Sequence, residues 1–147
     1  MTDASNYAPS PREWVSTQVA EYEASGGTKA NTLRETGLPI IVVTTTGART
    51  GAIRKTPLMR VEHDGEYALV ASVGGAPKHP VWYFNLLAHA DSVFIQDGPE
   101  PFAVSIRELS GAEKAEWWER AVSAYPPYAD YKVKTERQIP VFVATPR

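Results

Sequence analysis

The chain has 147 residues, 43% of them hydrophobic and 22% charged, a composition typical of one globular domain with a real core. Its formal net charge of -2 argues against a general nucleic-acid binder, which would carry a basic surface. It has no cysteine, so disulfides and thiolate metal sites are excluded and a cytoplasmic location is expected.

The first 25 residues predict a mobile arm followed by a helix. Residues 1–10 are polar and proline-bearing, without the basic start or the apolar stretch of a secretion signal. Pro11 then opens a helix that runs to about Ser25, where two glycines stop it. The residues that share one face of this helix are Trp14, Val15, Gln18, Val19 and Tyr22. Such a face is typical of a helix docked on its own core, and peripheral contact with a membrane is the alternative.

The middle of the chain predicts three strands and a short helix. Residues 40–46, "IIVVTTT", are rich in β-branched side chains, and residues 53–63 alternate in polarity, so both segments favour strands. The turn "HDGE" leads into a third strand over 67–73. A glycine-containing loop, 74–79, follows, and Pro80 starts a short helix.

The last third predicts further strands and one longer helix. Strands are expected over 92–96, 101–109 and 139–145. Ser110 and Glu113 form a capping-box pattern for a helix that ends near Ala124, and an aromatic segment, 125–131, follows it.

Five or six short strands with two or three helices predict a single α+β domain spanning residues 1–147. Hairpin-length connections dominate the middle of the chain, so a largely antiparallel sheet that curls into a barrel is expected. The strands do not alternate with full-length helices and no G-x-G-x-x-G follows a strand, which argues against a dinucleotide-binding Rossmann fold.

Positive charge and glycine concentrate in "TTTGARTGAIRKTP", residues 44–57, and no Asp or Glu interrupts residues 38–61. One interpretation is a solvated basic face. The other is an anion site, because Gly47 and Gly51 bracket a tight connection whose backbone N–H groups can approach a ligand. The segment lacks the Gly-Lys-Ser/Thr ending of a Walker A loop, so nucleotide triphosphate hydrolysis is disfavoured.

Other common chemistries have no signature in this sequence. The three histidines, His63, His79 and His89, have no partners at metal-ligand spacing, so we expect no metal. No G-x-S-x-G elbow is present, and no particular carboxylate pair stands out.

A second glycine-containing and basic segment, "SVGGAPKHPVWYFN", covers residues 72–85. If it faces the first segment, Arg49, Arg54 and Lys78 would hold a phosphate or carboxylates. The amides of the glycine loop and the N-terminus of the helix that begins at Pro80 would add hydrogen-bond donors.

The segments "TTTGARTGAIRKTPL", "ASVGGAPKHPVWYFNL", "AYPPYADY" and "RQIPVF" resemble, in this order, segments of the deazaflavin-dependent nitroreductase family, the F420-dependent reductases of actinobacteria. The resemblance runs from about Leu38 to Thr145. It implies a split β-barrel that binds coenzyme F420, a deazaflavin with a phosphate and an oligoglutamate tail, in a groove lined by the two loops.

The resemblance also implies which residues bind the cofactor. In the first loop the candidates are Arg49, Thr50, Gly51, Arg54, Thr56 and Pro57. In the second loop they are Ser72, Gly74, Gly75, Lys78, His79, Pro80, Trp82 and Asn85.

Four residues are candidates for the reaction itself. Ser72 is expected near the deazaflavin ring. Tyr125, Tyr128 and Tyr131 match the family's aromatic segment over the substrate pocket, and as phenols with an ordinary pKa near 10 they would be protonated donors at neutral pH. The alternative is that the three rings only form a hydrophobic cover over the barrel mouth.

The resulting hypothesis is an F420H2-dependent reductase that transfers hydride from the deazaflavin C5 to quinones, nitro compounds or activated enones. Met59 stands where the nitro-drug reducer of the family has an aromatic residue, which disfavours nitroimidazole activation. The family resemblance favours quinones as acceptors. The alternatives are an FMN-dependent split-barrel oxidoreductase and a non-catalytic carrier of an anionic deazaflavin.

Overall fold

The structure, a computed structural model, describes residues 7–33, 36–72, 78–135 and 138–147. These residues form seven strands and four helices, more than the sequence predicts. The helices are α1 (Glu13–Ala24), α2 (Val81–Ala88), α3 (Gly111–Ala124) and α4 (Pro127–Lys134). The strands are β1 (Ile40–Thr46), β2 (Ile53–Met59), β3 (Glu62–His63), β4 (Glu66–Val70), β5 (Val93–Gln96), β6 (Pro101–Glu108) and β7 (Val141–Pro146).

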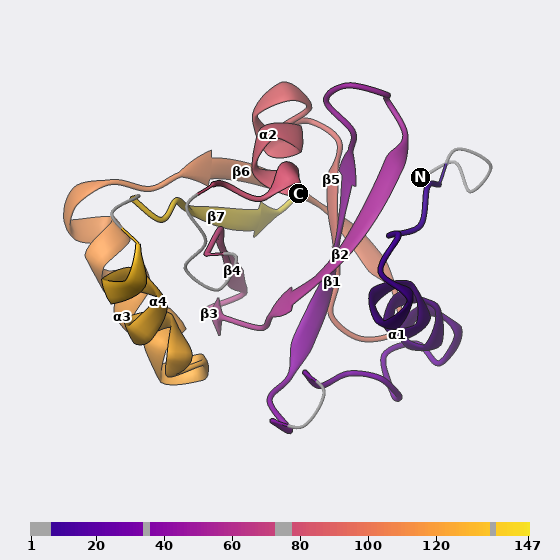
Figure 1. Cartoon of the computed structure of the whole chain (residues 1–147), viewed down its shortest axis with the longest axis horizontal. Helices are drawn as coiled ribbons and strands as arrows, with labels where there is room; N and C mark the ends of the chain where they lie inside the picture. Colours follow the sequence, from indigo (N-terminus) through magenta and orange to yellow (C-terminus); the bar gives the residue numbers. More distant parts are fainter. Residues whose placement is uncertain (1–6, 34–35, 73–77, 136–137) are drawn as a thin grey trace.

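The described strands form one antiparallel sheet in the order β2-β1-β5-β6-β7-β4-β3. The sheet curls, and the helices flank it: α1 lies at one side in Figure 1, α3 and α4 lie together at the other, and α2 lies at the top. This architecture confirms the predicted α+β class with a mainly antiparallel, barrel-like sheet.

The predicted single strand over 53–63 is wrong, because the chain bends at Arg60 and Val61 and moves from one end of the sheet to the other. The backbone N–H of Arg60 still donates to Pro39 beside β1, at 3.0 Å, whereas Val61 accepts from Ala68 of β4, at 2.9 Å. Strands that bend in this way make the corners of closed or partly closed sheets. The bend therefore joins β2 to β3 and brings the sheet ends together.

Two apolar clusters pack on the two faces of the sheet, which explains the uninterrupted apolar run of β1. Ile40 and Val42 join a cluster with residues of α1, α3 and α4. Ile41 and Val43 point to the other face, where Leu86 of α2 also packs. A strand that is buried on both faces lacks the polar alternation of a half-exposed strand.

The N-terminal region differs in part from its prediction. Tyr7 bridges Ile53 of β2 and the backbone N–H of Ala8 donates to the Ile53 carbonyl at 2.9 Å, so the end of the predicted mobile arm is fixed along β2. Helix α1 buries Val19 and Tyr22 against the core, as expected for a docked helix. Among the described helices none is long and apolar enough to cross a membrane.

The predicted capping box of α3 is also wrong. Ser110 is the N-cap residue, but its side chain makes no capping hydrogen bond. Glu113 instead accepts two hydrogen bonds from the Arg107 guanidinium, at 2.7 and 2.6 Å. A bidentate charged pair is stronger than the neutral capping contact that it replaces.

Helix α4 is an addition to the predicted elements, because the predictions for 125–131 include only an aromatic segment. Pro127 stands in its first turn, and Lys132 and Lys134 stand in its last. Proline at the start and lysine at the end are ordinary helix signals, so the sequence does contain evidence for this helix.

Candidate functional site

The turn between β1 and β2 is held by its own hydrogen bonds. Gly47 donates to the Ala52 carbonyl at 2.7 Å, and Gly51 donates to the Gly47 carbonyl at 2.9 Å. A Cβ at Gly47 would lie 3.0 Å from the hydroxyl oxygen of Thr50, and Gly51 has a φ of 72°, so both positions favour glycine. The two glycine N–H groups therefore stabilise the turn itself.

Asn85 attaches helix α2 to this turn. Its Oδ1 accepts from the N–H of Ala48 at 2.9 Å, and its Nδ2 donates to the Thr45 hydroxyl at 3.4 Å. The side chain is buried. Asn85 therefore positions the turn between β1 and β2 relative to α2.

A pocket of about 400 Å³ lies where β2, α2 and the N-terminal segment meet. We call it the Arg54 pocket. Its lining residues are Ala8, Ser10, Pro11, Arg12, Arg54, Lys55, Thr56, Val81, Trp82 and Asn85. It brings together four predicted cofactor-binding residues from both loops, Arg54, Thr56, Trp82 and Asn85.

Arg12 and Ser10 of the Arg54 pocket were not predicted. The sequence contains no signal for them, because only the docking of the N-terminal segment on β2 places Arg12 near Arg54. Lys55 was recognised as part of the basic segment but not as a site residue.

The charges of the Arg54 pocket are only partly neutralised. Lys55 pairs with Glu23 at 2.5 Å and lies over the Tyr7 ring, 4.8 Å from its centroid. Arg54 donates to the Ala8 carbonyl at 3.3 Å. Within the described residues neither Arg12 nor Arg54 forms an ion pair with a carboxylate. Two guanidinium groups thus remain available for an anion.

Those of the other predicted cofactor-binding residues that the structure describes lie outside the lining of this pocket. Arg49, Thr50 and Gly51 are exposed on the β1–β2 turn, and Pro57 pairs with Val42 inside the sheet. Lys78 is exposed, His79 packs on Tyr83 with ring centroids 4.4 Å apart, and Pro80 is the N-cap residue of α2. Gly74 and Gly75 lie outside the described residues.

The three predicted tyrosines form a cluster with one another. The rings of Tyr125 and Tyr128 meet edge to face at 5.0 Å, and the hydroxyls of Tyr125 and Tyr131 are 3.0 Å apart. Burial and the hydrogen bond to Tyr131 raise the pKa of Tyr125 to about 12, and burial raises the pKa of Tyr128 further. The phenols of Tyr125 and Tyr128 are therefore neutral donors at pH 7.

The tyrosine cluster and Ser72 are not part of the Arg54 pocket. Tyr128 is buried in the core cluster with α1, α3 and β4, and Tyr125 and Tyr131 pack against that cluster. Ser72 is buried just after the end of β4. No cluster of His, Asp and Glu among residues 7–33, 36–72, 78–135 and 138–147 is arranged to hold a metal.

The fold defines a class, the split-barrel-like α+β proteins, and the Arg54 pocket adds two guanidinium groups that line one space. Residues 14–146 match the family model described as F420H(2)-dependent quinone reductase. The chain belongs to this family.

Relatives and solved structures agree with this assignment. The chain is 37% identical over 112 residues to the F420H(2)-dependent quinone reductase Rv1261c of Mycobacterium tuberculosis (strain ATCC 25618 / H37Rv), covering 74% of each protein. A solved F420-H2 dependent reductase (FDR-A) is 55% identical, with a TM-score of 0.67 over 72% of this chain and 93% of the other. A solved structure described as a domain-swapped dimer is 48% identical, with a TM-score of 0.70 over 92% and 99%.

Family membership settles the reaction class. The chain is an F420H2-dependent oxidoreductase, and reduced coenzyme F420 is its cofactor. The leading hypothesis from the sequence is confirmed at this level, and the FMN-dependent and non-catalytic alternatives are disfavoured.

Proposed function

We propose that the chain reduces quinones with F420H2 and that the Arg54 pocket binds the acidic part of the cofactor. The observation that carries this proposal is the meeting of Arg12 and Arg54 in one pocket with Thr56 and Trp82. Phosphate and carboxylate groups fit this donor set, because guanidinium groups bind both with paired, charge-assisted hydrogen bonds. When bound, F420H2 supplies hydride from its deazaflavin carbon.

The chain's own residues orient the cofactor and hold it. Arg54 and Arg12 neutralise the acidic groups, the Thr56 hydroxyl adds a hydrogen bond, and Trp82 provides an apolar wall. Asn85 supports this arrangement indirectly, since it fixes the turn that starts β2. Binding energy from the remote tail can hold the ring in the reactive orientation.

Tyr125 and Tyr131 are suited to donate a hydrogen bond to the acceptor oxygen. Their hydroxyls are 3.0 Å apart, so one donates to the other and the second keeps its proton for another acceptor. A donor aimed at an oxygen that gains charge during hydride transfer stabilises the transition state. Tyr128 is assigned to the same tyrosine cluster, and Ser72 is assigned to the surroundings of the deazaflavin ring.

Quinones are the proposed natural acceptors, because similar proteins are named F420H(2)-dependent quinone reductases. Nitro compounds and activated enones are proposed as further acceptors, because they also accept hydride at an electron-poor atom. Met59 is buried in the core, so it affects their fit only through packing.

Helix α1 is proposed to contact the surface of a membrane that contains lipid-soluble quinones. Trp14 at its start is 37% exposed, whereas Val19 and Tyr22 face the core. Flotation with vesicles tests this point: Trp14→Ser should reduce vesicle binding, and equal binding of both proteins would contradict it.

Stopped-flow oxidation of F420H2 by menadione tests the proposed reaction. Oxidation should saturate with menadione and depend on enzyme concentration, and a parallel titration should show tight binding of F420 but not FMN. Binding of F420 without faster oxidation would contradict quinone reduction, and tight binding of FMN alone would contradict the cofactor assignment.

A further inference from the structure

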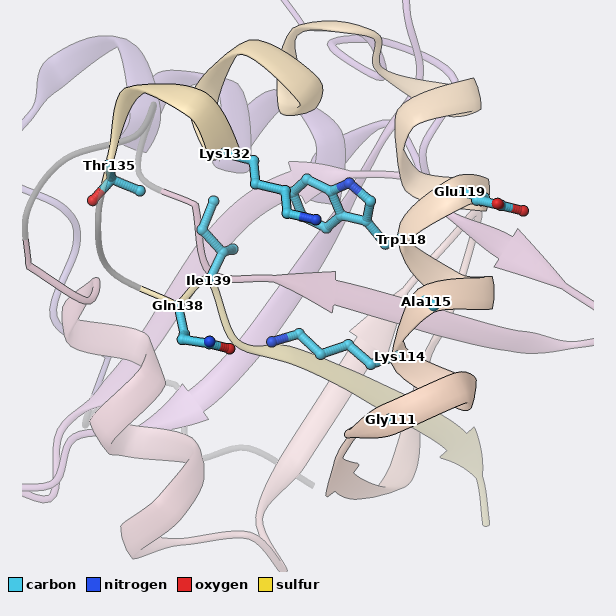
Figure 2. Close-up of a pocket in the computed structure, with 9 residues that line it drawn as sticks. All are labelled: Gly111, Lys114, Ala115, Trp118, Glu119, Lys132, Thr135, Gln138 and Ile139. Carbon is cyan, nitrogen blue, oxygen red and sulfur yellow. The ribbon is translucent and has the colours of Figure 1, made fainter.

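A groove of about 600 Å³ lies between α3 and α4, apart from the Arg54 pocket. Figure 2 shows its residues: Trp118, Ala115 and Lys114 come from α3, Lys132 from α4, and Gln138 and Ile139 from the segment before β7. Among the described residues, none that lines the groove also lines the Arg54 pocket. Its volume is within the range of small-molecule sites, roughly 300 to 1,000 Å³.

The walls of the groove combine aromatic and aliphatic surface. Trp118 is half-buried, Ile139 is buried, and Ala115 adds a small side chain on the same helix. The Trp118 ring already attracts a cation, since Lys132 Nζ lies 5.5 Å from its centroid. A flat indole surface favours stacking with a planar ligand.

The polar groups of the groove are cationic. Figure 2 shows the ammonium group of Lys114 turned towards Gln138 and the carboxylate of Glu119 pointing away from both lysines. Considering only the part of the chain that the structure describes, Lys114 and Lys132 make no ion pair with a carboxylate. Two ammonium groups beside an amide donor can bind a carboxylate.

We infer that the groove between α3 and α4 is a second ligand site, for a planar aromatic carboxylic acid. The ring would lie against Trp118 and Ile139, and the carboxylate would meet Lys114, Lys132 and the Gln138 amide. Trp118 also packs on Tyr128, with ring centroids 6.1 Å apart, so the site adjoins the tyrosine cluster.

The test is calorimetric titration with 2-naphthoate and with its neutral counterpart, 2-naphthamide. Both titrations use protein saturated with F420, so that the acid cannot bind in the Arg54 pocket. Naphthoate should bind about tenfold more tightly than the amide, because only the acid meets the lysines.

Lysine variants locate the site. Lys114→Met and Lys132→Met keep the apolar stem and should each weaken naphthoate binding about threefold to tenfold, with the amide little affected. The matched control is Lys134→Met, which removes the same charge from α4 at a position outside the groove and should leave binding unchanged.

Four results would overturn the inference: no naphthoate binding, equal affinities for the acid and the amide, unchanged binding in the Lys114 and Lys132 variants, or an equal loss in the Lys134 variant. None of these results bears on F420 binding or quinone reduction, which are measured separately.

Discussion

At the scale of single residues, the basic segment 44–57 contributes one guanidinium group, that of Arg54, to the Arg54 pocket. The neighbouring Lys55 is neutralised by Glu23, and the exposed Arg49 lies in the turn. Arg54 instead reaches the N-terminal segment and shares a pocket with Arg12. Within the basic segment Arg54 thus lines the pocket, and Arg12 from the N-terminal segment adds a second guanidinium group to the same space.

Replacing Arg54 by alanine should weaken F420 binding by about 1.5 to 3 kcal/mol, because a charge-assisted contact is lost. The loss should be larger at low salt, where screening is weaker. Fluorescence titration of F420 measures it, and Arg107→Ala, which removes an equal charge outside the pocket, is the control. An unchanged dissociation constant for Arg54→Ala would contradict the assignment.

The raised pKa of Tyr125 predicts that the folded protein becomes less stable at alkaline pH. Its pKa is raised from 10.0 to about 12 in the folded protein, so the unfolded chain loses this proton first as the pH rises. The stabilisation is complete below pH 10 and is lost between about pH 10 and 12. The free energy of unfolding should therefore fall less steeply in Tyr125→Phe than in the wild type over this range. Equal slopes in urea denaturation would show that the shift is absent.

At the scale of elements, α2 is attached to the β1–β2 turn by a side chain rather than by sheet pairing. Asn85 makes hydrogen bonds to Ala48 and Thr45. The turn that contains Ala48 leads directly into β2 and so determines where this strand begins. Because both Trp82 of α2 and Arg54 of β2 line the pocket, this attachment fixes the two walls relative to each other.

Asn85→Ala should lower the free energy of unfolding by about 1 to 3 kcal/mol, because the Ala48 N–H loses its acceptor. Thr45→Val, which removes only the longer 3.4 Å bond, should cost less. Urea denaturation of both variants measures the difference. A larger loss in Thr45→Val would mean that the bond to Ala48 is not the main one.

At the scale of the whole molecule, one polar cluster holds the bend between β2 and β3. Arg60 at the bend donates from Nε to both carboxylate oxygens of Asp97, at 3.0 Å, and the Tyr67 hydroxyl donates to the same carboxylate at 2.6 Å. Asp97 follows β5 and Tyr67 belongs to β4, so the cluster connects segments that are distant along the sheet order.

Asp97→Ala should destabilise the fold by about 1 to 3 kcal/mol, since two partly buried donors lose their acceptor. Glu113→Ala, which removes a fully exposed pair with Arg107, should change stability much less. Thermal and urea unfolding compare the two variants. Similar effects would show that the cluster at the bend has no special structural role.

The amino-acid sequence is sufficient to predict the elements with strong local signals and the family. The β-branched run predicts β1 with its observed bounds, Pro80 predicts the start of α2, and the spaced motifs lead to the F420-dependent reductases. These features depend on neighbouring residues, whose backbone preferences can be assessed without knowing the fold.

Three other features become visible only in the folded chain: the bend at Arg60, the pairing of Arg107 with the Glu113 carboxylate expected to cap α3, and the meeting of Arg12 with Arg54. Each of these outcomes depends on a partner from another element. Several side chains could pair with the same charged group or hydrogen-bond donor. The pair that forms is the one whose members the folded chain brings within contact distance.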